Sequence, residues 1–227
     1  MTTQEQHTFD WYRDRLGRIT GSCVGEIVGR GKGAAFSKSG YTYLNTVASE
    51  RLIPAYITDD DELFRQYLDE TSVSSKSMRI GTLREDEARQ LYQDLTCYPV
   101  SEVGCMPHQD IDGFASSPDG VIYLDGEHPV GVLEIKCPKP NTFVEYLTQV
   151  KTPSDLRKYN NKYFWQCLAH LAVTGAKWCD FVVYCPYIET PIHKIRITPE
   201  EADMRTLIAR VKEALQYIDS VTGKAAV

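Results

Sequence analysis

The spacing of apolar residues predicts helices in the first part of the chain. In ITGSCVGEIVG, apolar residues recur at helical spacing, and Thr20 and Ser22 are candidate N-caps. The segments YTYLNTVASERL and SMRIGTLREDEARQLYQDL also predict helices. The second of these has an apolar side, with Glu85 near its border, that is formed by Ile80, Leu83, Ala88, Leu91 and Leu95.

The apolar pattern changes after this helix. YPVSEVGCMPH, DGFASSPDGVIYL and PVGVLEIKCP are rich in Val, Ile and Tyr and are punctuated by Gly, Pro and Asp, which predicts three or four strands with tight connections. A long helix is then expected over residues 157–174, ending at Gly175. Two strands, WCDFVVYCP and PIHKIRI, and a C-terminal helix beginning near Pro199 follow. This order predicts an α/β fold with a central mixed β-sheet flanked by α-helices.

Length and composition predict one substantial core. The chain has 227 residues, of which 42% are hydrophobic, and we expect a single domain over residues 1–227. It lacks an apolar run of the roughly 18 residues that a membrane span needs, and its N-terminus does not resemble a signal peptide. Its cysteines are odd in number and include no C-x-x-C pair, which favours reduced thiols over a zinc or iron–sulfur site. We therefore expect a cytoplasmic protein that does not bind membranes.

The distribution of charge is uneven. Although the net charge is -6, bases outnumber acids from Thr8 to Gly40 and from Lys136 to Lys162, and acids are concentrated in residues 59–70. An acidic total can therefore coexist with a basic face suited to nucleic acid. Ordinary solvated surfaces would produce the same distribution, and the acidic segment 59–70 has no assigned role.

The stretch SSPDGVIYLDGEHPVGVLEIKCP places charge on a strand. Because side chains alternate, Glu134 and Lys136 share one face of the strand, and the apolar residues of LEIKC share the other. A hairpin turn at Asp125-Gly126 would bring Asp119 towards Glu134. Two carboxylates about 4 Å apart repel by roughly 4 kcal/mol at an effective dielectric near 20, and a divalent cation such as Mg²⁺ reverses that cost. The alternative is an exposed ion pair between Glu134 and Lys136 worth ~0.2–1 kcal/mol.

The order of several motifs along the chain resembles a known nuclease family. WYRDRLGRITGS, GTLREDEARQLY, SPDG, LEIKCP and YFWQCLAHLAVTG follow one another as in the lambda exonuclease and YqaJ-like viral recombinase family of the PD-(D/E)XK nuclease superfamily. The acid-x-Lys element alone is a weak signal, and the resemblance rests on the co-occurrence of these motifs. It implies a restriction-endonuclease-like core.

The resemblance also implies a catalytic site. Lys136 matches the catalytic lysine, and Gln166 matches a helix glutamine that helps to position the attacking water. The metal ligands would be the carboxylates of Glu85, Asp119 and Glu134 and the main-chain carbonyl of Ile135, so that the catalytic set comprises Lys136, Glu134, Asp119 and Gln166. For Glu85 the alternative is a solvated helix face formed by residues 84–87.

Further positions match DNA-binding elements of the family. Arg15 and Ser22, in R-x-x-x-x-[ST]-x-S, would bind a terminal 5′ phosphate, and a helix N-terminus at Ser22 would suit an anion. Ser117 would be another phosphate contact, or else a serine that stabilises a turn. Met78 would wedge against the last base pair, or else pack in the core. The complete DNA-binding set is Arg15, Ser22, Ser117, Arg30, Lys32, Met78 and Tyr163, with Arg30 and Lys32 near a loop that follows the DNA.

Together these matches imply a Mg²⁺-dependent 5′-to-3′ exonuclease. Such an enzyme degrades one strand of linear duplex DNA from a 5′-phosphorylated end and leaves 3′ single strands for phage-type recombination by strand annealing. The resemblance further implies two Mg²⁺ ions per site, with Mn²⁺ as a substitute, a homotrimeric ring and a single-strand annealing protein as partner. It places the protein in the cytoplasm of a bacterial host as a phage or prophage product. The alternatives are a DNA endonuclease of the same fold and a catalytically silent DNA-end-binding protein.

Overall fold

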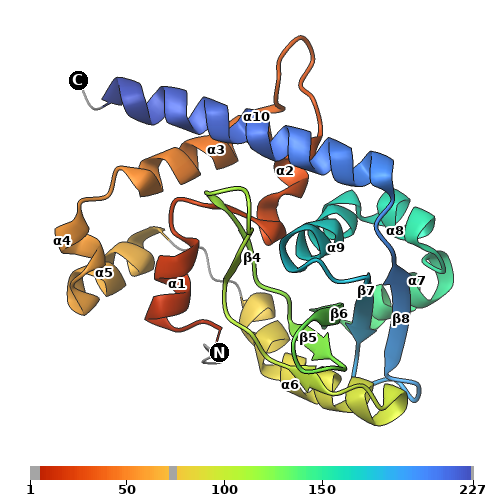
Figure 1. The fold of residues 1–227 in the computed structure, drawn as a ribbon. Helices are drawn as coiled ribbons and strands as arrows, with labels where there is room; N and C mark the ends of the chain where they lie inside the picture. Colours follow the sequence, from red (N-terminus) through yellow and green to blue (C-terminus); the bar gives the residue numbers. More distant parts are fainter. Residues whose placement is uncertain (1–5, 72–75, 226–227) are drawn as a thin grey trace.

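The computed structural model describes residues 6–71 and 76–225, the side chains of 76–82, 224 and 225 excepted. A larger and a smaller β-sheet lie at the centre, with helices around them (Figure 1). The larger sheet has the order β2-β5-β6-β7-β8, with the bounds Val100–Ser101, Gly120–Tyr123, Pro129–Lys136, Trp178–Tyr184 and Ile192–Ile197. Strands β6 and β7 are parallel and the other neighbours are antiparallel, so the predicted mixed sheet is confirmed.

The smaller sheet joins segments that are far apart in the sequence. Its order is β1-β4-β3, with the bounds Ile19–Thr20, Phe114–Ser116 and Met106–Pro107. Strand β1 pairs in parallel with β4, which places Thr20 opposite Ala115. The N-terminal segment therefore lies beside the residues that lead into SPDG.

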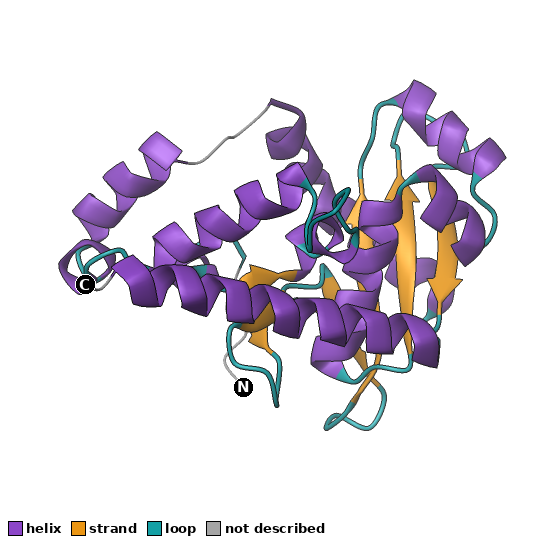
Figure 2. Cartoon of the chain, turned by 90° about the horizontal axis from the view of Figure 1, so that it is seen from above, coloured by secondary structure: helices purple, strands orange, loops and turns teal. Residues whose placement is uncertain are grey.

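Helices cover both faces of the larger sheet (Figure 2). On one face, α6 buries Ala88 and Tyr92 against Leu133 and Ile135 of β6. The other face packs against α9 and, beyond it, against α10, which runs across the top of Figure 1. The helices are α1 Phe9–Arg15, the 3-10 turn η1 Gly21–Cys23, α2 Gly25–Val28, α3 Lys38–Arg51, α4 Ala55–Thr58, α5 Asp61–Thr71, α6 Lys76–Thr96, α7 Pro140–Gln149, α8 Pro153–Tyr159, α9 Asn161–Thr174 and α10 Glu201–Ala225.

The predicted hairpin is confirmed. Strands β5 and β6 are antiparallel, with Gly120 opposite Leu133. Between them, the carboxylate of Asp125 accepts the backbone N–H groups of Glu127 and His128, a local pattern that favours a turn. Gly126 has a φ of 81°, a left-handed conformation that glycine adopts without strain.

The long helix expected over 157–174 is two helices. The chain breaks at Asn160, whose side chain accepts the N–H of Tyr163 over 3.3 Å and so caps α9. An asparagine that satisfies a free amide at a helix start competes with a continuous helix. The predicted end at Gly175 is confirmed, since this glycine has a φ of 69°.

The helix expected in ITGSCVGEIVG is largely absent. Ile19 and Thr20 form β1, and only η1 and the four residues of α2 are helical. Thr20 precedes η1 without a side-chain capping bond, and Ser22 lies within that turn. Both N-cap expectations are therefore wrong, because pairing with β4 takes the residues that the helix would have used.

The apolar side predicted for α6 is also partly wrong. Leu83 and Leu95 are 77% and 62% exposed, whereas Ala88 and Tyr92 are fully buried. Glu85 is half-buried and lies seven residues before Tyr92, on the same side of the helix. The helix is therefore rotated so that Glu85 faces the protein, and the alternative of a fully solvated face at this position is wrong.

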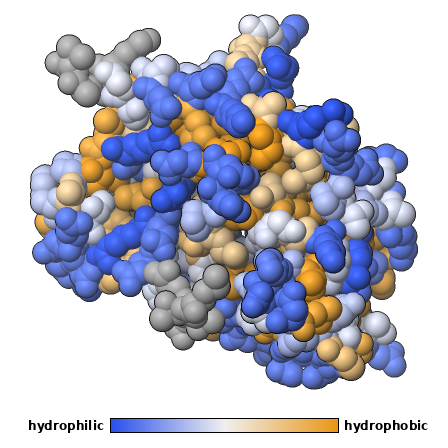
Figure 3. All heavy atoms as spheres, in the orientation of Figure 1, coloured by the Kyte–Doolittle hydropathy of each residue, from blue (hydrophilic) through white to orange (hydrophobic). Residues whose placement is uncertain are grey.

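Apolar residues at the surface come from separate elements. The face seen in Figure 3 mixes hydrophilic and apolar side chains, and the largest exposed fractions belong to residues of four different segments, Tyr56, Leu83, Leu124 and Tyr187. Scattered exposure of this kind does not mark a docking surface. Within residues 6–71 and 76–225, no helix combines the length and the apolarity needed to cross a membrane.

Candidate active site

The hairpin holds Asp119 against strand β6. Its N–H donates to the carbonyl of Leu133 over 3.0 Å, and the N–H of Ile135 donates to its carboxylate over 2.5 Å. Arg89 of α6 donates to the carbonyl of Asp119 over 2.9 Å. Asp119 is therefore held at the position that the turn predicts, beside Glu134.

Glu134 is buried beneath α9. Its side chain has no exposed surface, and its Oε2 lies 2.6 Å from Nε2 of His170. Its Oε1 forms an ion pair with the ammonium of Lys136, but among the described residues this atom has no hydrogen-bond partner. The alternative of an exposed ion pair between Glu134 and Lys136 is therefore wrong, and the charged face of β6 is enclosed.

One face of α9 covers this charged strand. The ammonium of Lys136 lies 5.1 Å from the ring centre of Tyr163. Gln166 is buried, and by helical spacing it shares the face that carries Tyr163 and His170. The structure thus places Tyr163 beside Lys136 of this strand, and Gln166 lies buried on the same face of α9.

The acidic groups perturb one another. Burial raises the pKa of Asp119 well above its usual value, and Glu134 raises it further. Burial also raises the pKa of Glu85. Lys136 offsets part of this increase, and Glu134 adds to it. Glu85 from α6 therefore lies within the field of the charged face of β6, so the site draws on both layers of helices.

Lys136 balances this acidic group. Burial alone would lower its pKa, but Glu134 and then Asp119 raise it well above the usual lysine value. Burial alone would raise the pKa of Glu134, but Lys136 and His170 bring it below the usual value. The pair is therefore ionised in the structure, a carboxylate facing an ammonium.

The donor set fits a hard divalent cation. Among the described residues, no three acid, histidine or cysteine side chains already form a coordination shell. Glu85, Asp119 and Glu134 nevertheless offer carboxylate oxygens, the ligands that Mg²⁺ and Mn²⁺ prefer. The buried Oε1 of Glu134, which lacks a hydrogen bond, is the kind of atom that a cation would satisfy.

A second cluster forms around Arg15. Its guanidinium donates to Oγ of Ser117 and to Oγ of Ser22, each over 3.1 Å. The guanidinium also lies over the ring of Trp11, 4.3 Å from its centre, and the indole N–H of Trp11 donates to Ser117 over 3.1 Å. We call Arg15, Ser22 and Ser117 the Arg15 cluster. Ser117 lies 102 residues after Arg15, and these three expected phosphate contacts meet at one place.

The charge of this cluster comes from Arg15 and not from a helix terminus. The helical segments next to Ser22 are three and four residues long, too short for the amide dipoles of a full helix to add up. Ser117 binds Arg15 and Trp11 through its hydroxyl, so its contacts are tertiary and not those of a local turn.

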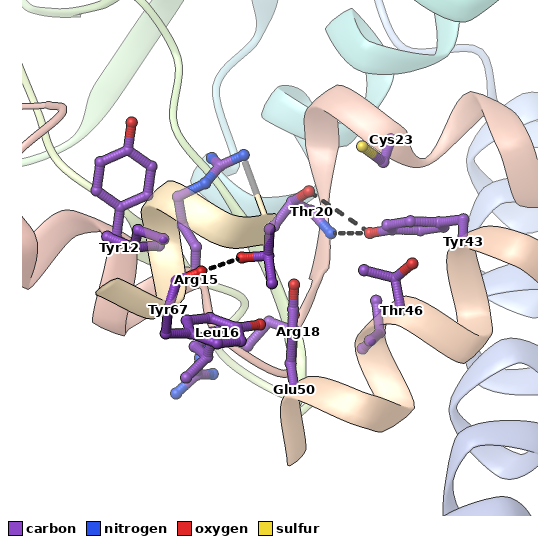
Figure 4. Close-up of a pocket in the computed structure, with 13 residues that line it drawn as sticks. Tyr12, Arg15, Leu16, Arg18, Thr20, Cys23, Tyr43, Thr46, Glu50 and Tyr67 are labelled. Carbon is purple, nitrogen blue, oxygen red and sulfur yellow. Dashed lines mark hydrogen bonds between the residues drawn. The ribbon is translucent and has the colours of Figure 1, made fainter. Parts of the chain in front are cut away.

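A cavity of about 290 Å³ opens beside Arg15 (Figure 4). In its wall, the phenol oxygen of Tyr43 accepts the N–H of Thr20 over 2.8 Å. Burial raises the pKa of Glu50, whose carboxylate accepts the N–H of Gly17 over 2.9 Å. Aromatic and charged side chains line the rest, including Tyr12, Arg15, Arg18 and Tyr67.

Other expected DNA contacts lie apart from this cluster. Arg30 and Lys32 are exposed in the loop between α2 and α3, which projects past α10 in Figure 1. Arg210 of α10 holds the base of this loop through the carbonyls of Gly29 and Ala35. Met78 is in the first turns of α6, but its side chain lies outside the described part of the chain.

Sequence reasoning missed His170 and Ser116. Ser116 Oγ lies 2.6 Å from Nδ1 of His170, whose other ring nitrogen contacts Glu134. The signal for His170 was its position four residues after Gln166, on the same helix face. Ser116 had no local signal, because only the packing of α9 over β4 brings it to the histidine.

Comparisons with known proteins agree with this geometry. Residues 10–177 match the family described as the YqaJ-like viral recombinase domain. The alkaline exonuclease LHK-Exo from Laribacter hongkongensis is 28% identical, with a TM-score of 0.72 over 96% of this chain and 98% of that one. Its complex with dAMP has a TM-score of 0.74 at the same identity and coverage. No curated protein matches the chain.

A more distant structure shows the same fold. A phage-related exonuclease from Haemophilus somnus 129PT is 12% identical, with a TM-score of 0.67 over 92% of this chain and 96% of that one. The family match spans well over half of the chain and contains α6, the hairpin and α9. The chain therefore belongs to the YqaJ-like viral recombinase family and has the restriction-endonuclease-like fold of the PD-(D/E)XK nucleases.

Proposed function

We propose that this protein is a deoxyribonuclease that requires a divalent metal and degrades one strand of linear duplex DNA from a 5′-phosphorylated end, in the 5′-to-3′ direction. Family membership and the likeness to an alkaline exonuclease support the nuclease activity. One observation carries the choice of substrate end. Ser117, which binds Arg15, stands two residues before Asp119 of the acidic site.

The metal would be held by the carboxylates of Glu85, Asp119 and Glu134 and by the carbonyl of Ile135. We propose two Mg²⁺ ions per site, for which Mn²⁺ is a substitute with the same ligand preference. When bound, such ions supply an activated water and stabilise the attacking and leaving oxygens of the phosphodiester. The buried Oε1 of Glu134, which has an ion pair with Lys136 but no hydrogen-bond partner among the described residues, supports this assignment.

Residues of the chain orient the reaction. Lys136, kept charged by Glu134 and Asp119, would hold the negative charge that grows on the attacked phosphate. Gln166 would accept or donate a hydrogen bond to the attacking water, for which an amide has both kinds of atom. Tyr163, whose ring centre lies 5.1 Å from the ammonium of Lys136, would help to hold that ammonium in place.

The Arg15 cluster would bind the terminal 5′ phosphate. An arginine beside two hydroxyls matches a phosphate group, because its planar donors form paired, charge-assisted bonds to phosphate oxygens. The cavity beside Arg15 has tyrosine walls and room for part of the terminal nucleotide. Arg30 and Lys32 would follow the duplex, and Met78 would lie at the last base pair.

The product would be a duplex with 3′ single-stranded ends. Such ends suit recombination by strand annealing, and we propose a phage-type role in the cytoplasm of a bacterial host with a single-strand annealing protein as partner. We also propose a homotrimeric ring around the DNA. Both proposals rest on the family and call for their own tests by sizing and by co-purification with the annealing protein.

Digestion of end-labelled DNA tests the function. A linear duplex labelled at either 5′ or 3′ ends, with a 5′ phosphate or a 5′ hydroxyl, is incubated with and without Mg²⁺. We expect early release of the 5′ label, loss of activity without metal, and slower digestion of the 5′-hydroxyl duplex. A covalently closed circular duplex is the matched control.

Two outcomes would favour the alternatives. Cutting of closed circles as fast as linear DNA would indicate an endonuclease of the same fold. Tight binding to duplex ends without hydrolysis, at any metal concentration, would indicate a silent end-binding protein.

A further inference from the structure

A buried chain of hydrogen bonds links two strands through α9. Oγ of Ser116 lies 2.6 Å from Nδ1 of His170, and Nε2 of His170 lies 2.6 Å from Oε2 of Glu134. Ser116, His170 and Glu134 are at most 1% exposed. Water therefore does not compete for these bonds, and each group is tied to the next.

The chemistry of Glu134 decides which atom donates in its hydrogen bond with His170. The ionised carboxylate of Glu134 can only accept, so Nε2 of His170 carries the hydrogen. The other ring nitrogen, Nδ1, is joined by a hydrogen bond to the hydroxyl of Ser116. His170 therefore holds one oxygen of Glu134 and leaves the other, Oε1, towards Lys136.

Ser116, at the far end of this series of hydrogen bonds, adjoins the Arg15 cluster. Ser116 ends β4, and the next residue, Ser117, binds Arg15 and Trp11. Gly21, the neighbour of Ser22, also packs against Ser116, since a Cβ atom on Gly21 would clash with Ser116 Oγ. Both serines of the Arg15 cluster are thus one residue from a direct contact with the buried chain.

We propose that Ser116 and His170 are positioning residues that set the orientation of Glu134 and couple it to the Arg15 cluster. A 5′ phosphate bound at Arg15 would replace Ser117 as the acceptor of Arg15 and so change the orientation of the peptide group between Ser116 and Ser117. The change would be passed to Glu134 through the hydrogen bonds of His170. A phosphorylated DNA end would in this way favour the metal-binding arrangement of the acidic site. The inference rests on the proposed function.

Substitutions at His170 separate its two contacts. In His170→Gln, the amide nitrogen can replace Nε2 and still donate to Glu134. In His170→Asn, the shorter amide can keep the hydrogen bond to Ser116 but does not reach Glu134. His170→Leu removes both contacts at similar volume. Ser116→Ala removes the link to β4 and leaves the histidine in place.

Two readouts are used, each with 5′-phosphorylated and with 5′-hydroxyl duplex. They are the Mg²⁺ concentration for half-maximal activity and the dissociation constant of Ca²⁺ from calorimetry. For the wild type we expect lower values on the phosphorylated duplex. We expect His170→Leu and His170→Asn to raise both values about 10-fold or more on both substrates, since partners of metal ligands commonly affect affinity on this scale. His170→Gln should recover most of this loss.

Ser116→Ala should act differently from the histidine variants. In the wild type we expect the half-saturating Mg²⁺ concentration to differ about fivefold between the two substrates, the effect of one hydrogen bond. In Ser116→Ala this concentration should be the same on both substrates, because the coupling is lost. Leu168→Ala, a buried substitution on α9 that leaves the chain of hydrogen bonds intact, is the control. It should lower thermal stability and keep the wild-type difference.

The outcomes distinguish this inference from the proposed function. A wild type that leaves linear duplex intact would contradict the proposed function. A wild type that is active and prefers 5′ phosphate, but with equal metal requirements on both ends, would contradict the coupling alone. Equal metal requirements in wild type, His170→Gln and His170→Asn would contradict the positioning role, and this comparison stands even where His170→Leu does not fold.

Discussion

The guanidinium of Arg15 donates a hydrogen bond to the hydroxyl of Ser117, 102 residues further along the chain, over 3.1 Å. Ser117 stands two residues before Asp119, whose carboxylate is fixed to the backbone of Ile135. This contact therefore joins a positive cluster to the segment that carries an acidic site. Binding of a terminal phosphate and hydrolysis of the phosphodiester are proposed to occur on its two sides.

Loss of Arg15 should remove the preference for phosphorylated ends. We expect Arg15→Ala to slow digestion of 5′-phosphorylated duplex about 10-fold or more, because hydrogen bonds to a charged group are among the stronger ones. Digestion of 5′-hydroxyl duplex should change little. Arg205→Ala removes the same charge from an exposed site on α10 and is the control. An unchanged ratio of the two rates in Arg15→Ala would contradict phosphate binding here.

Loss of Lys136 should stop hydrolysis without preventing DNA binding. We expect Lys136→Ala to reduce the single-turnover rate by about 100-fold or more, the effect of removing one group that stabilises transition-state charge. End binding, measured by fluorescence anisotropy in Ca²⁺, should persist. Lys177→Ala, a lysine just before β7 and outside the site, is the control. Undiminished turnover in Lys136→Ala would rule out its catalytic assignment.

Removal of single carboxylates should weaken metal binding. Asp119→Asn, Glu134→Gln and Glu85→Gln each take away an anionic ligand, and we expect the affinity for Mn²⁺, followed by calorimetry, to fall in all three. Chelation by EDTA should abolish digestion by the wild type. Asp94→Asn changes an exposed acid on the same helix as Glu85 and should bind Mn²⁺ normally. Normal affinity in Glu85→Gln would remove that residue from the ligand set.

The stabilising effect of metal should grow with pH. Burial raises the pKa of both Glu85 and Asp119, so the folded protein holds their protons more tightly than the unfolded chain does. Without metal, the contribution of these groups to stability therefore falls as pH rises from the unfolded pKa values of about 4 through the raised folded ones. Bound metal compensates the ionised carboxylates, so the increase in Tm on adding Mg²⁺ should be larger at about pH 8 than at about pH 5. A constant increase would contradict this linkage.

The far edge of the sheet contains a separate test of stability. Asp180 is fully buried and accepts from Nε of Arg196 over 2.8 Å and from the hydroxyl of Tyr92 over 2.7 Å. We expect Arg196→Met to lower the free energy of unfolding in urea by about 3 kcal/mol, because it leaves a buried charge without its main partner. Arg205→Met, at an exposed position, should change this free energy by less than about 0.5 kcal/mol. Equal changes in the free energy of unfolding for Arg196→Met and Arg205→Met would show that the charge of Asp180 is stabilised without Arg196.

Local patterns sufficed for much of the fold and for the acidic residues. Alternation along β6 placed Glu134 and Lys136 together, and the turn at Asp125-Gly126 brought Asp119 to the same strand. Both are short-range effects of backbone geometry, so they can be predicted from neighbouring residues. The order of motifs added the family, which the match over residues 10–177 confirms.

Local patterns failed where tertiary contacts compete with them. In ITGSCVGEIVG, where a helix was expected, Ile19 and Thr20 pair with β4 instead, and only η1 and α2 are helical. The long helix breaks at Asn160, where a side chain caps a new helix. Leu83 and Leu95 are exposed because α6 turns Tyr92 towards Asp180.

The sequence by itself determined which residue types carry the chemistry and on which strand face they lie, since alternation and turn geometry act over a few residues. Only the tertiary structure decided that Arg15, Ser22 and Ser117 meet, and that Ser116 and His170 connect this cluster to Glu134. All of these contacts except Arg15–Ser22 join residues tens of positions apart. The cluster forms where β1 pairs with β4, and the contacts of His170 form where α9 packs over β4 and β6. Such packing depends on the shape of the whole core rather than on any local period.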